Sequence, residues 1–167
     1  MADLLTHALI AFSITTVLSW RYTSITSSYI TAAMVGSTLP DLTRIGLIID
    51  SVVIEETLNI PFSWPPLPTL GGVLITATII TALVDKKHTK PVFLLLGLGA
   101  ASHLILDIFL INASGHSYAV LFPFSSIHPA TPGFYLSTNV WPVIVAGLIA
   151  IFVWRIDTSK FKKKNLI

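Results

Sequence analysis

Residues 91–111 read PVFLLLGLGAASHLILDIFLI, and this apolar run decides the fold class. A helix needs about 20 mostly apolar residues to cross a bilayer, with about 17 as the lower end. The run meets that length, and its only titratable side chains are His103 and Asp107. Across the chain 53% of the residues are hydrophobic and 11% are charged, whereas a soluble domain carries about 25% charged residues. We therefore expect a transmembrane helix here and lipid around the folded chain.

Four more apolar segments predict further transmembrane helices. With 91–111 they give spans at residues 4–20, 25–48, 70–84, 91–111 and 140–156. The second span is the weakest, because it continues past Pro40. A length of 167 residues is enough for one domain. The prediction is a single all-α membrane domain over residues 1–167, a bundle of five transmembrane helices. The connection at 112–139 is apolar and lacks Lys and Arg, and we expect it to fold back over the helices.

The basic residues predict the orientation of this bundle. Nine of the ten Lys and Arg residues follow the first, third and fifth spans, and only Arg44 lies on the opposite side. Positive charge concentrates in cytoplasmic segments. We therefore expect a multi-pass protein of the cell membrane with its N-terminus outside, its C-terminus inside and a basic cytoplasmic tail at 157–167. The basic residues form short clusters, which do not indicate a nucleic-acid partner.

Titratable residues inside the spans are the candidate functional residues. A charge near the bilayer centre costs roughly 2.5–3.5 kcal/mol on insertion scales. His103 and Asp107 share one face of their helix, about 6 Å apart. With the N-terminus outside, all the candidates lie at a similar depth on the outer side. They are His7, Asp41, His103 and Asp107. Two imidazoles and two carboxylates suit zinc or another divalent ion, and the absence of cysteine excludes thiolate ligands.

A purely structural explanation of these residues stays open at this stage. His103 could hydrogen-bond Asp107 within its own helix, Asp41 could cap a helix end after Pro40, and His7 could lie neutral in the interface. Buried His and Asp also form cation pathways in carriers. A carrier, however, needs polar groups through the whole membrane, and none is marked in the inner half. His116 and His128, in the outer connection, are weaker candidates that could reach the same surface.

The candidate residues also lie in four short motifs. These are Thr6-His7, Leu39-Pro40-Asp41, Ser102-His103-x-x-x-Asp107 and Leu121-Phe122-Pro123. In order and approximate spacing, over most of the chain, they resemble the YdjM-like family of membrane-bound metal-dependent hydrolases. The resemblance implies a polytopic membrane protein with a divalent-metal site and hydrolytic activity on a phosphoester or lipid substrate.

Two departures from that family change what the resemblance implies. The family's second motif usually reads Pro-Asp-x-Asp-His, whereas this chain has Pro-Asp-Leu-Thr-Arg at 40–44. A His-rich motif before the third helix is also missing, since residues 66–72 contain no histidine. A site for two metals is therefore not expected, and a retained scaffold without catalysis is an alternative.

Two hypotheses follow. The first is a metal-dependent hydrolase whose site opens to the outer leaflet and is covered by the apolar outer connection that contains Leu121-Phe122-Pro123. His7, Asp41 and His103 would bind one metal ion, and Asp107 would be a fourth ligand, orient His103 or act as the catalytic base. The second is a non-catalytic membrane protein, a cation or small-solute carrier or a scaffold, that retains a degenerate metal site.

Overall fold

The fold is all-helical, as predicted. The computed structural model describes residues 4–164, with side chains to residue 160, and within them it has seven helices and no named strand. In chain order these are α1 (Leu4–Arg21), α2 (Ser27–Gly36), the 3-10 helix η1 (Pro40–Leu47), α3 (Ser51–Leu58), α4 (Leu70–Ala82), α5 (Lys86–Ile108) and α6 (Trp141–Lys164). The expected outer N-terminal residues 1–3 and the end of the basic tail, 165–167, lie outside the described part. The start of that tail continues α6.

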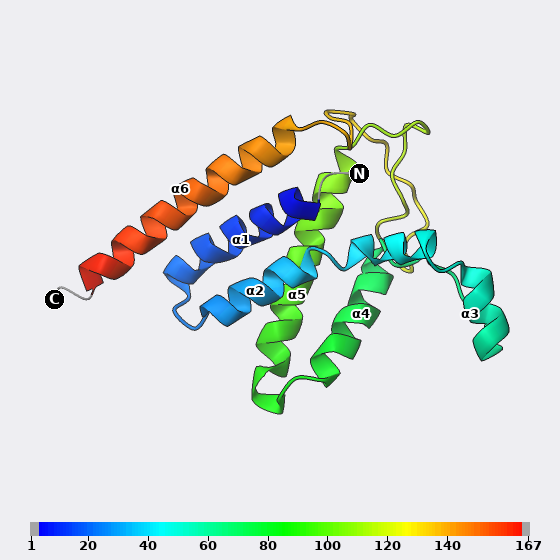
Figure 1. Ribbon diagram of the computed structural model, residues 1–167, viewed down its shortest axis with the longest axis horizontal. Coiled ribbons are helices and arrows are strands. Elements are labelled where there is room, and N and C mark those ends of the chain that lie inside the picture. Colours follow the sequence, from blue (N-terminus) through cyan, green and yellow to red (C-terminus); the bar gives the residue numbers. More distant parts are fainter. Residues whose placement is uncertain (1–3, 165–167) are drawn as a thin grey trace.

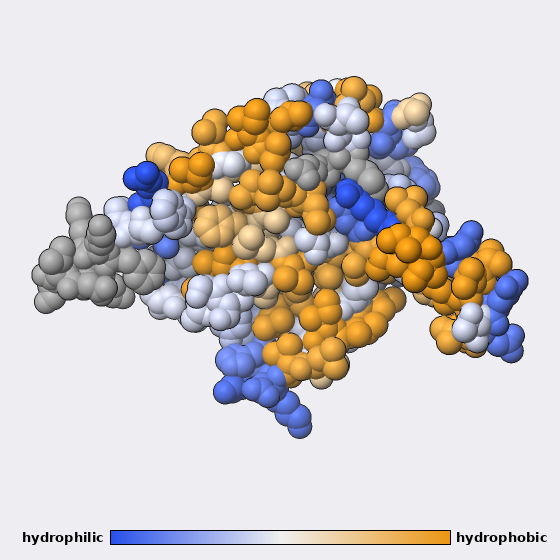
Figure 2. Space-filling view, viewed as in Figure 1, coloured by the Kyte–Doolittle hydropathy of each residue, from blue (hydrophilic) through white to orange (hydrophobic). Residues whose placement is uncertain are grey.

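Three of the helices are long and apolar enough to cross a membrane. They are α1, α5 and the part of α6 over Trp141–Lys160. They correspond to the expected spans 4–20, 91–111 and 140–156. Large apolar side chains of α6, such as Ile144, Leu148 and Phe152, are exposed, and hydrophobic residues cover much of the face in Figure 2. Apolar exposure on this scale is unusual for a soluble monomer and suggests association with a membrane.

The other two expected spans are shorter in the structure. α4 has 13 residues, below the length of a span. The segment 25–48 is not one helix, because α2 ends at Gly36 and η1 begins at Pro40. Proline lacks an amide hydrogen, and its ring clashes with the carbonyl four residues earlier. An α-helix therefore cannot continue undisturbed from Gly36 through Pro40.

The core that positions the candidate site is the packing of α1, α2 and α5 (Figure 1). α6 lies along α1, and α4 lies along α5. Glycines bring α2 and α5 into close contact, since a Cβ on Gly99 would overlap the carbonyl oxygen of Ala33 and one on Gly36 would overlap that of Leu96. Small residues of this kind let membrane helices approach closely.

The connection between α5 and α6 folds back over the helices, as expected. The amide of Leu70 donates to the carbonyl of Val120 at 2.8 Å, and the amide of Gly71 donates to that of Phe122 at 2.8 Å. These bonds satisfy amides that the first turn of α4 leaves without intrahelical partners. A further bond, from the amide of Ile111 to the carbonyl of Tyr135 at 2.8 Å, ties the connection to the end of α5.

Candidate metal centre

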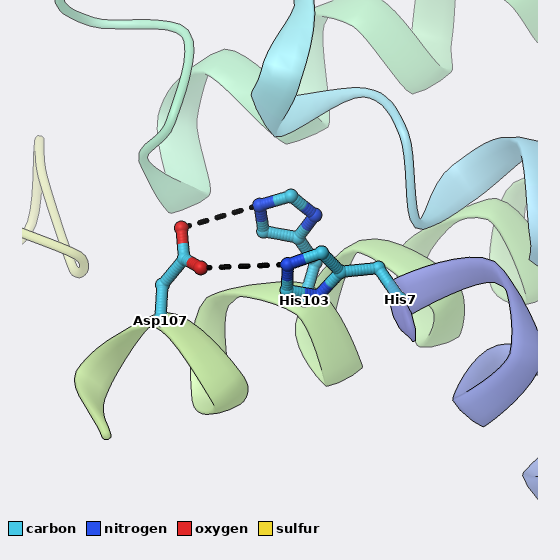
Figure 3. Close-up of side chains that lie close together, drawn as sticks. All are labelled: His7, His103 and Asp107. Atoms are coloured by element: carbon cyan, nitrogen blue, oxygen red, sulfur yellow. Dashed lines mark ion pairs between the residues drawn. The ribbon is translucent and has the colours of Figure 1, made fainter. Parts of the chain in front are cut away.

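Three of the predicted site residues meet between α1 and α5. Figure 3 shows the imidazoles of His7 and His103 directed at the carboxylate of Asp107. His7 Nε2 lies 3.5 Å from Asp107 Oδ1, and His103 Nε2 lies 3.2 Å from Asp107 Oδ2. One possible ligand atom from each residue falls within 4.8 Å of the others. Both histidine side chains are 1% exposed and the aspartate is 22% exposed, so the group is buried with one partly open side.

Helix geometry brings these residues together. His103 and Asp107 are four residues apart on α5 and therefore lie on the same face of the helix. α1 packs against that face and stacks the His7 ring on the His103 ring, with centroids 3.7 Å apart and an interplanar angle of 15°. All three side chains point toward one another within the helix bundle. Side chains that faced lipid would have argued against a joint role.

A backbone carbonyl determines which nitrogen of His103 is free. His103 Nδ1 lies 2.6 Å from the carbonyl oxygen of Ser37, at the end of α2. A carbonyl can only accept, so Nδ1 carries the hydrogen and, in the neutral ring, Nε2 presents its lone pair to Asp107. A carboxylate is also an acceptor, and two acceptors 3.2 Å apart need a proton or a cation between them. Histidines that bind metals usually donate their other N–H to a carbonyl in this way.

His7 lacks the hydrogen bonds that a purely structural histidine would have. Its Nδ1 is buried and has no hydrogen-bond partner among the described residues. Its Nε2 lies 3.5 Å from Asp107, beyond the usual 2.7–3.2 Å of an N–H···O bond. An unsatisfied buried polar group costs about 1–3 kcal/mol. Nδ1 stays unsatisfied in either role, whereas Nε2 makes no good hydrogen bond and lies beside the Asp107 carboxylate, so Nε2 is the nitrogen of His7 that is available to a metal ion.

Asp41 lies beside this group but is not part of it. Its Oδ2 pairs with Arg44 Nη2 at 3.1 Å. It also lines a cavity of about 90 Å3 together with His103 and Asp107. The expected set of four is therefore divided in the structure into a close group of three and a carboxylate on the wall of the same cavity.

The connection between α5 and α6, which was expected to cover the site, contributes to the lining of the cavity. The lining includes Asn112, Ser117 and Tyr118 of this connection, whereas its Phe122 is bonded to the start of α4. His116 and His128 line an adjoining cavity of about 410 Å3 that shares Asn112, Ser117 and Tyr118 with the first. Nothing in the sequence pattern singled out these shared residues, or the carbonyl of Ser37, since both roles depend on tertiary packing.

The Tyr135 side chain holds the connection between α5 and α6 beside the centre. Its hydroxyl donates to the carbonyl of Leu106 at 2.9 Å. Burial, with a further contribution from the Asp107 carboxylate, raises the pKa of the Tyr135 phenol to about 12. The phenol therefore remains a hydrogen-bond donor at neutral pH and holds the connection against the end of α5.

The donor set defines what the centre can bind. His7, His103 and Asp107 form a group that could hold a metal ion. Three protein ligands with a fourth position free are typical of catalytic rather than structural zinc sites. No family model, curated protein or solved structure matches the chain, so the chemistry of these residues is the basis for assigning a function.

Proposed function

We propose that this chain is a multi-pass, metal-dependent hydrolase of the cell membrane, with five membrane segments and a site that opens to the outer leaflet. The single observation that carries the proposal is the Ser37 carbonyl on His103 Nδ1, which directs His103 Nε2 at Asp107 beside His7. Zinc fits this set of two imidazoles and a carboxylate best. The substrate would be a phosphoester or a lipid ester.

The cation distribution supports the proposed topology. The outer segments contain a single Lys or Arg, Arg44. Short α4 and the broken segment α2–η1 would cross with α1, α5 and α6, since neighbouring protein satisfies non-helical backbone at membrane depth.

Labelling of introduced cysteines tests this topology. The chain has no cysteine of its own, so each new thiol is unique. A cysteine in place of Ser126, an exposed position of the outer connection, should react with a membrane-impermeant maleimide on intact cells. A cysteine in place of Ser159, which is exposed on α6, should react only after permeabilisation. The opposite pattern would place the candidate centre on the cytoplasmic side and refute the outer-leaflet site.

Each residue of the candidate metal centre would have its own chemical role. A bound divalent ion would polarise the substrate and the attacking water. His7 and His103 would hold it through Nε2, with Ser37 fixing the second ring. Asp107 has two carboxylate oxygens, one near each ring, so it can contribute one oxygen to the metal and accept a proton from water with the other. The partly open side of Asp107 faces the cavity that would admit the substrate.

The structure offers less support for a carrier. A carrier needs polar groups along the whole path through the membrane. Among the buried hydroxyls in the inner half of α1, Ser13 donates to the carbonyl of Leu9 and Thr15 to that of Ala11, each at 2.8 Å, whereas Thr16 Oγ1 has no hydrogen-bond partner among the described residues. One unpaired hydroxyl on α1 does not make a continuous polar path, which favours a site confined to one side.

Asp107→Asn tests the hydrolase directly. The amide has the same shape but neither binds a metal well nor accepts a proton, so turnover should fall by at least about 100-fold. The assay is hydrolysis of bis(4-nitrophenyl) phosphate and of 4-nitrophenyl acyl esters by purified protein, with metal content measured in parallel. Asp85→Asn is the matched control, since Asp85 is exposed at the other end of α5. Equal turnover in wild type and Asp107→Asn would refute the proposed role, and metal-loaded wild type without turnover would favour the non-catalytic alternative.

A further inference from the structure

Arg44 occupies an unusual position for a basic residue of this chain. It is the one Lys or Arg on the side of the membrane opposite to the other nine in the predicted topology. Its side chain is 35% exposed, and its Nη2 lies 3.1 Å from Oδ2 of Asp41, whose side chain is 10% exposed. A 3-10 helix has three residues per turn, so side chains three apart eclipse one another. The change from α2 to η1 at Pro40 therefore places Arg44 over Asp41.

The Arg44 guanidinium has donors to spare. An arginine side chain has five N–H donors and no acceptor. The contact with Asp41 is an ion pair through Nη2 that is not aligned as a hydrogen bond, since Asp41 Oδ2 and Arg44 Nε are both buried atoms without a hydrogen-bond partner within the described part of the chain. Leaving such a donor unsatisfied is costly. An acceptor-rich ligand at this position would use the remaining donors.

Asp41 links Arg44 to the candidate metal centre. The Asp41 carboxylate holds Arg44 and also lines the cavity of about 90 Å3 that His103 and Asp107 line. Thr43, which precedes Arg44 on η1, lines the same cavity. The Asp41 carboxylate therefore contacts the guanidinium and lines the same cavity as the residues that would hold the metal ion.

The charges of this region favour a particular ligand. With a divalent ion bound, the carboxylates of Asp41 and Asp107 balance the metal, and the guanidinium leaves one positive charge uncompensated. A charge in surroundings of low dielectric interacts far more strongly than one in water, so a ligand with a single negative charge is favoured. A phosphodiester carries one negative charge, whereas a phosphomonoester carries about 1.5 to 2 at neutral pH. The planar guanidinium fork also matches two oxygens of a phosphate group.

We propose that Arg44, ion-paired with Asp41, binds the phosphate of a phosphodiester beside the cavity that Asp41 and Thr43 line. This proposal rests on the proposed function, because the charge balance includes the metal ion. Arg44 would hold the two non-bridging oxygens and leave an ester bond near Asp107. A phospholipid headgroup and a soluble phosphodiester share this chemistry.

Binding of dimethyl phosphate to metal-loaded protein in detergent tests the proposal without any turnover. Broadening of the phosphorus NMR signal gives the affinity. Arg44→Gln should weaken binding by at least about 10-fold, because a hydrogen-bonded charge contributes about 1.5–3 kcal/mol and 1.4 kcal/mol is tenfold. Arg155→Gln, at the other end of the bundle, is the matched control and should bind as wild type does. Equal affinity of wild type and Arg44→Gln, or tighter binding of methyl phosphate than of dimethyl phosphate, would overturn the proposal.

Metal content and the variant Arg44→Lys separate a failure of the Arg44 proposal from a failure of the metal centre or of folding. Metal content, measured in every variant, separates this proposal from the proposed function: wild type without metal refutes the centre, whereas equal metal with equal phosphate binding refutes only Arg44. If Arg44→Gln does not fold, Arg44→Lys decides, since it keeps the charge near Asp41 but not the fork. It should bind dimethyl phosphate several-fold more weakly than wild type, and unchanged binding would refute the role of the fork.

Competition identifies the source of the diester. Micelles that contain phosphatidylglycerol are compared with soluble glycerophosphoglycerol as competitors of dimethyl phosphate. Much stronger displacement by the micelles supports a lipid headgroup, and equal displacement supports a soluble diester. Displacement by neither would overturn the assignment of this position to phosphodiesters.

Discussion

His103→Ala is expected to abolish metal retention by the purified protein. The change removes Nε2, which is directed at Asp107, and Nδ1, which the Ser37 carbonyl holds at 2.6 Å. Even loss of an outer-shell partner typically costs 10–100-fold in metal affinity, so loss of a ligand should cost more than about 100-fold. Insertion should survive, because alanine makes α5 more apolar. Metal per protein, measured by plasma mass spectrometry after extensive dialysis, gives the result.

A second histidine on the same helix provides the matched control. His88 lies near the start of α5, where its Nδ1 is 2.7 Å from the hydroxyl of Tyr29. His88→Ala should leave the metal content unchanged, while His7→Ala should reduce it as His103→Ala does. A structural histidine would give another outcome: thermal stability would fall, with the same metal content in wild type and His103→Ala. That outcome, at equal expression, would refute the metal centre.

The sequence was most informative where one helix determines the geometry. His103 and Asp107 share a face at any position of an α-helix, and His7 lies in the first turn of α1, which begins at Leu4. Their meeting could be predicted because burial in a bundle is the less costly place for titratable groups in a membrane. The all-helical class followed from apolar runs alone.

Sequence was least informative where the chain leaves the α-helix. The apolar run 25–48 continues through Pro40, and hydropathy does not distinguish one long helix from α2 followed by η1. That difference explains why Asp41 pairs with Arg44 instead of joining the group of three. The Ser37 carbonyl has no side-chain signature, because any residue at the end of α2 would supply one.

Gly99→Ala is expected to impair the centre from a distance, by separating α2 from α5. A Cβ at this position would overlap the carbonyl oxygen of Ala33 and lie 2.7 Å from the amide nitrogen of Ser37. The contacted atoms all belong to the backbone of residues 33–37, so relief of the overlap requires movement of α2 itself. Gly99 is one helical turn before His103, and the moving segment includes the Ser37 carbonyl that orients the His103 ring. Overpacking typically costs 1–3 kcal/mol, and loss of the orienting bond should weaken metal binding by about 10–100-fold.

Gly97→Ala, on the same helix, separates this effect from a general effect of alanine. A Cβ on Gly97 meets no atom within 4 Å, and alanine favours helix over glycine by up to about 1 kcal/mol. Gly97→Ala should therefore keep the metal affinity of wild type and unfold at the same or a higher temperature. Because the Ser37 carbonyl belongs to the backbone, no side-chain substitution removes it, and displacement of α2 is the available means. If Gly99→Ala lowered the unfolding temperature but retained full metal affinity, the position of α2 would matter for stability alone, and the Ser37 carbonyl would not be what prepares His103 to bind a metal.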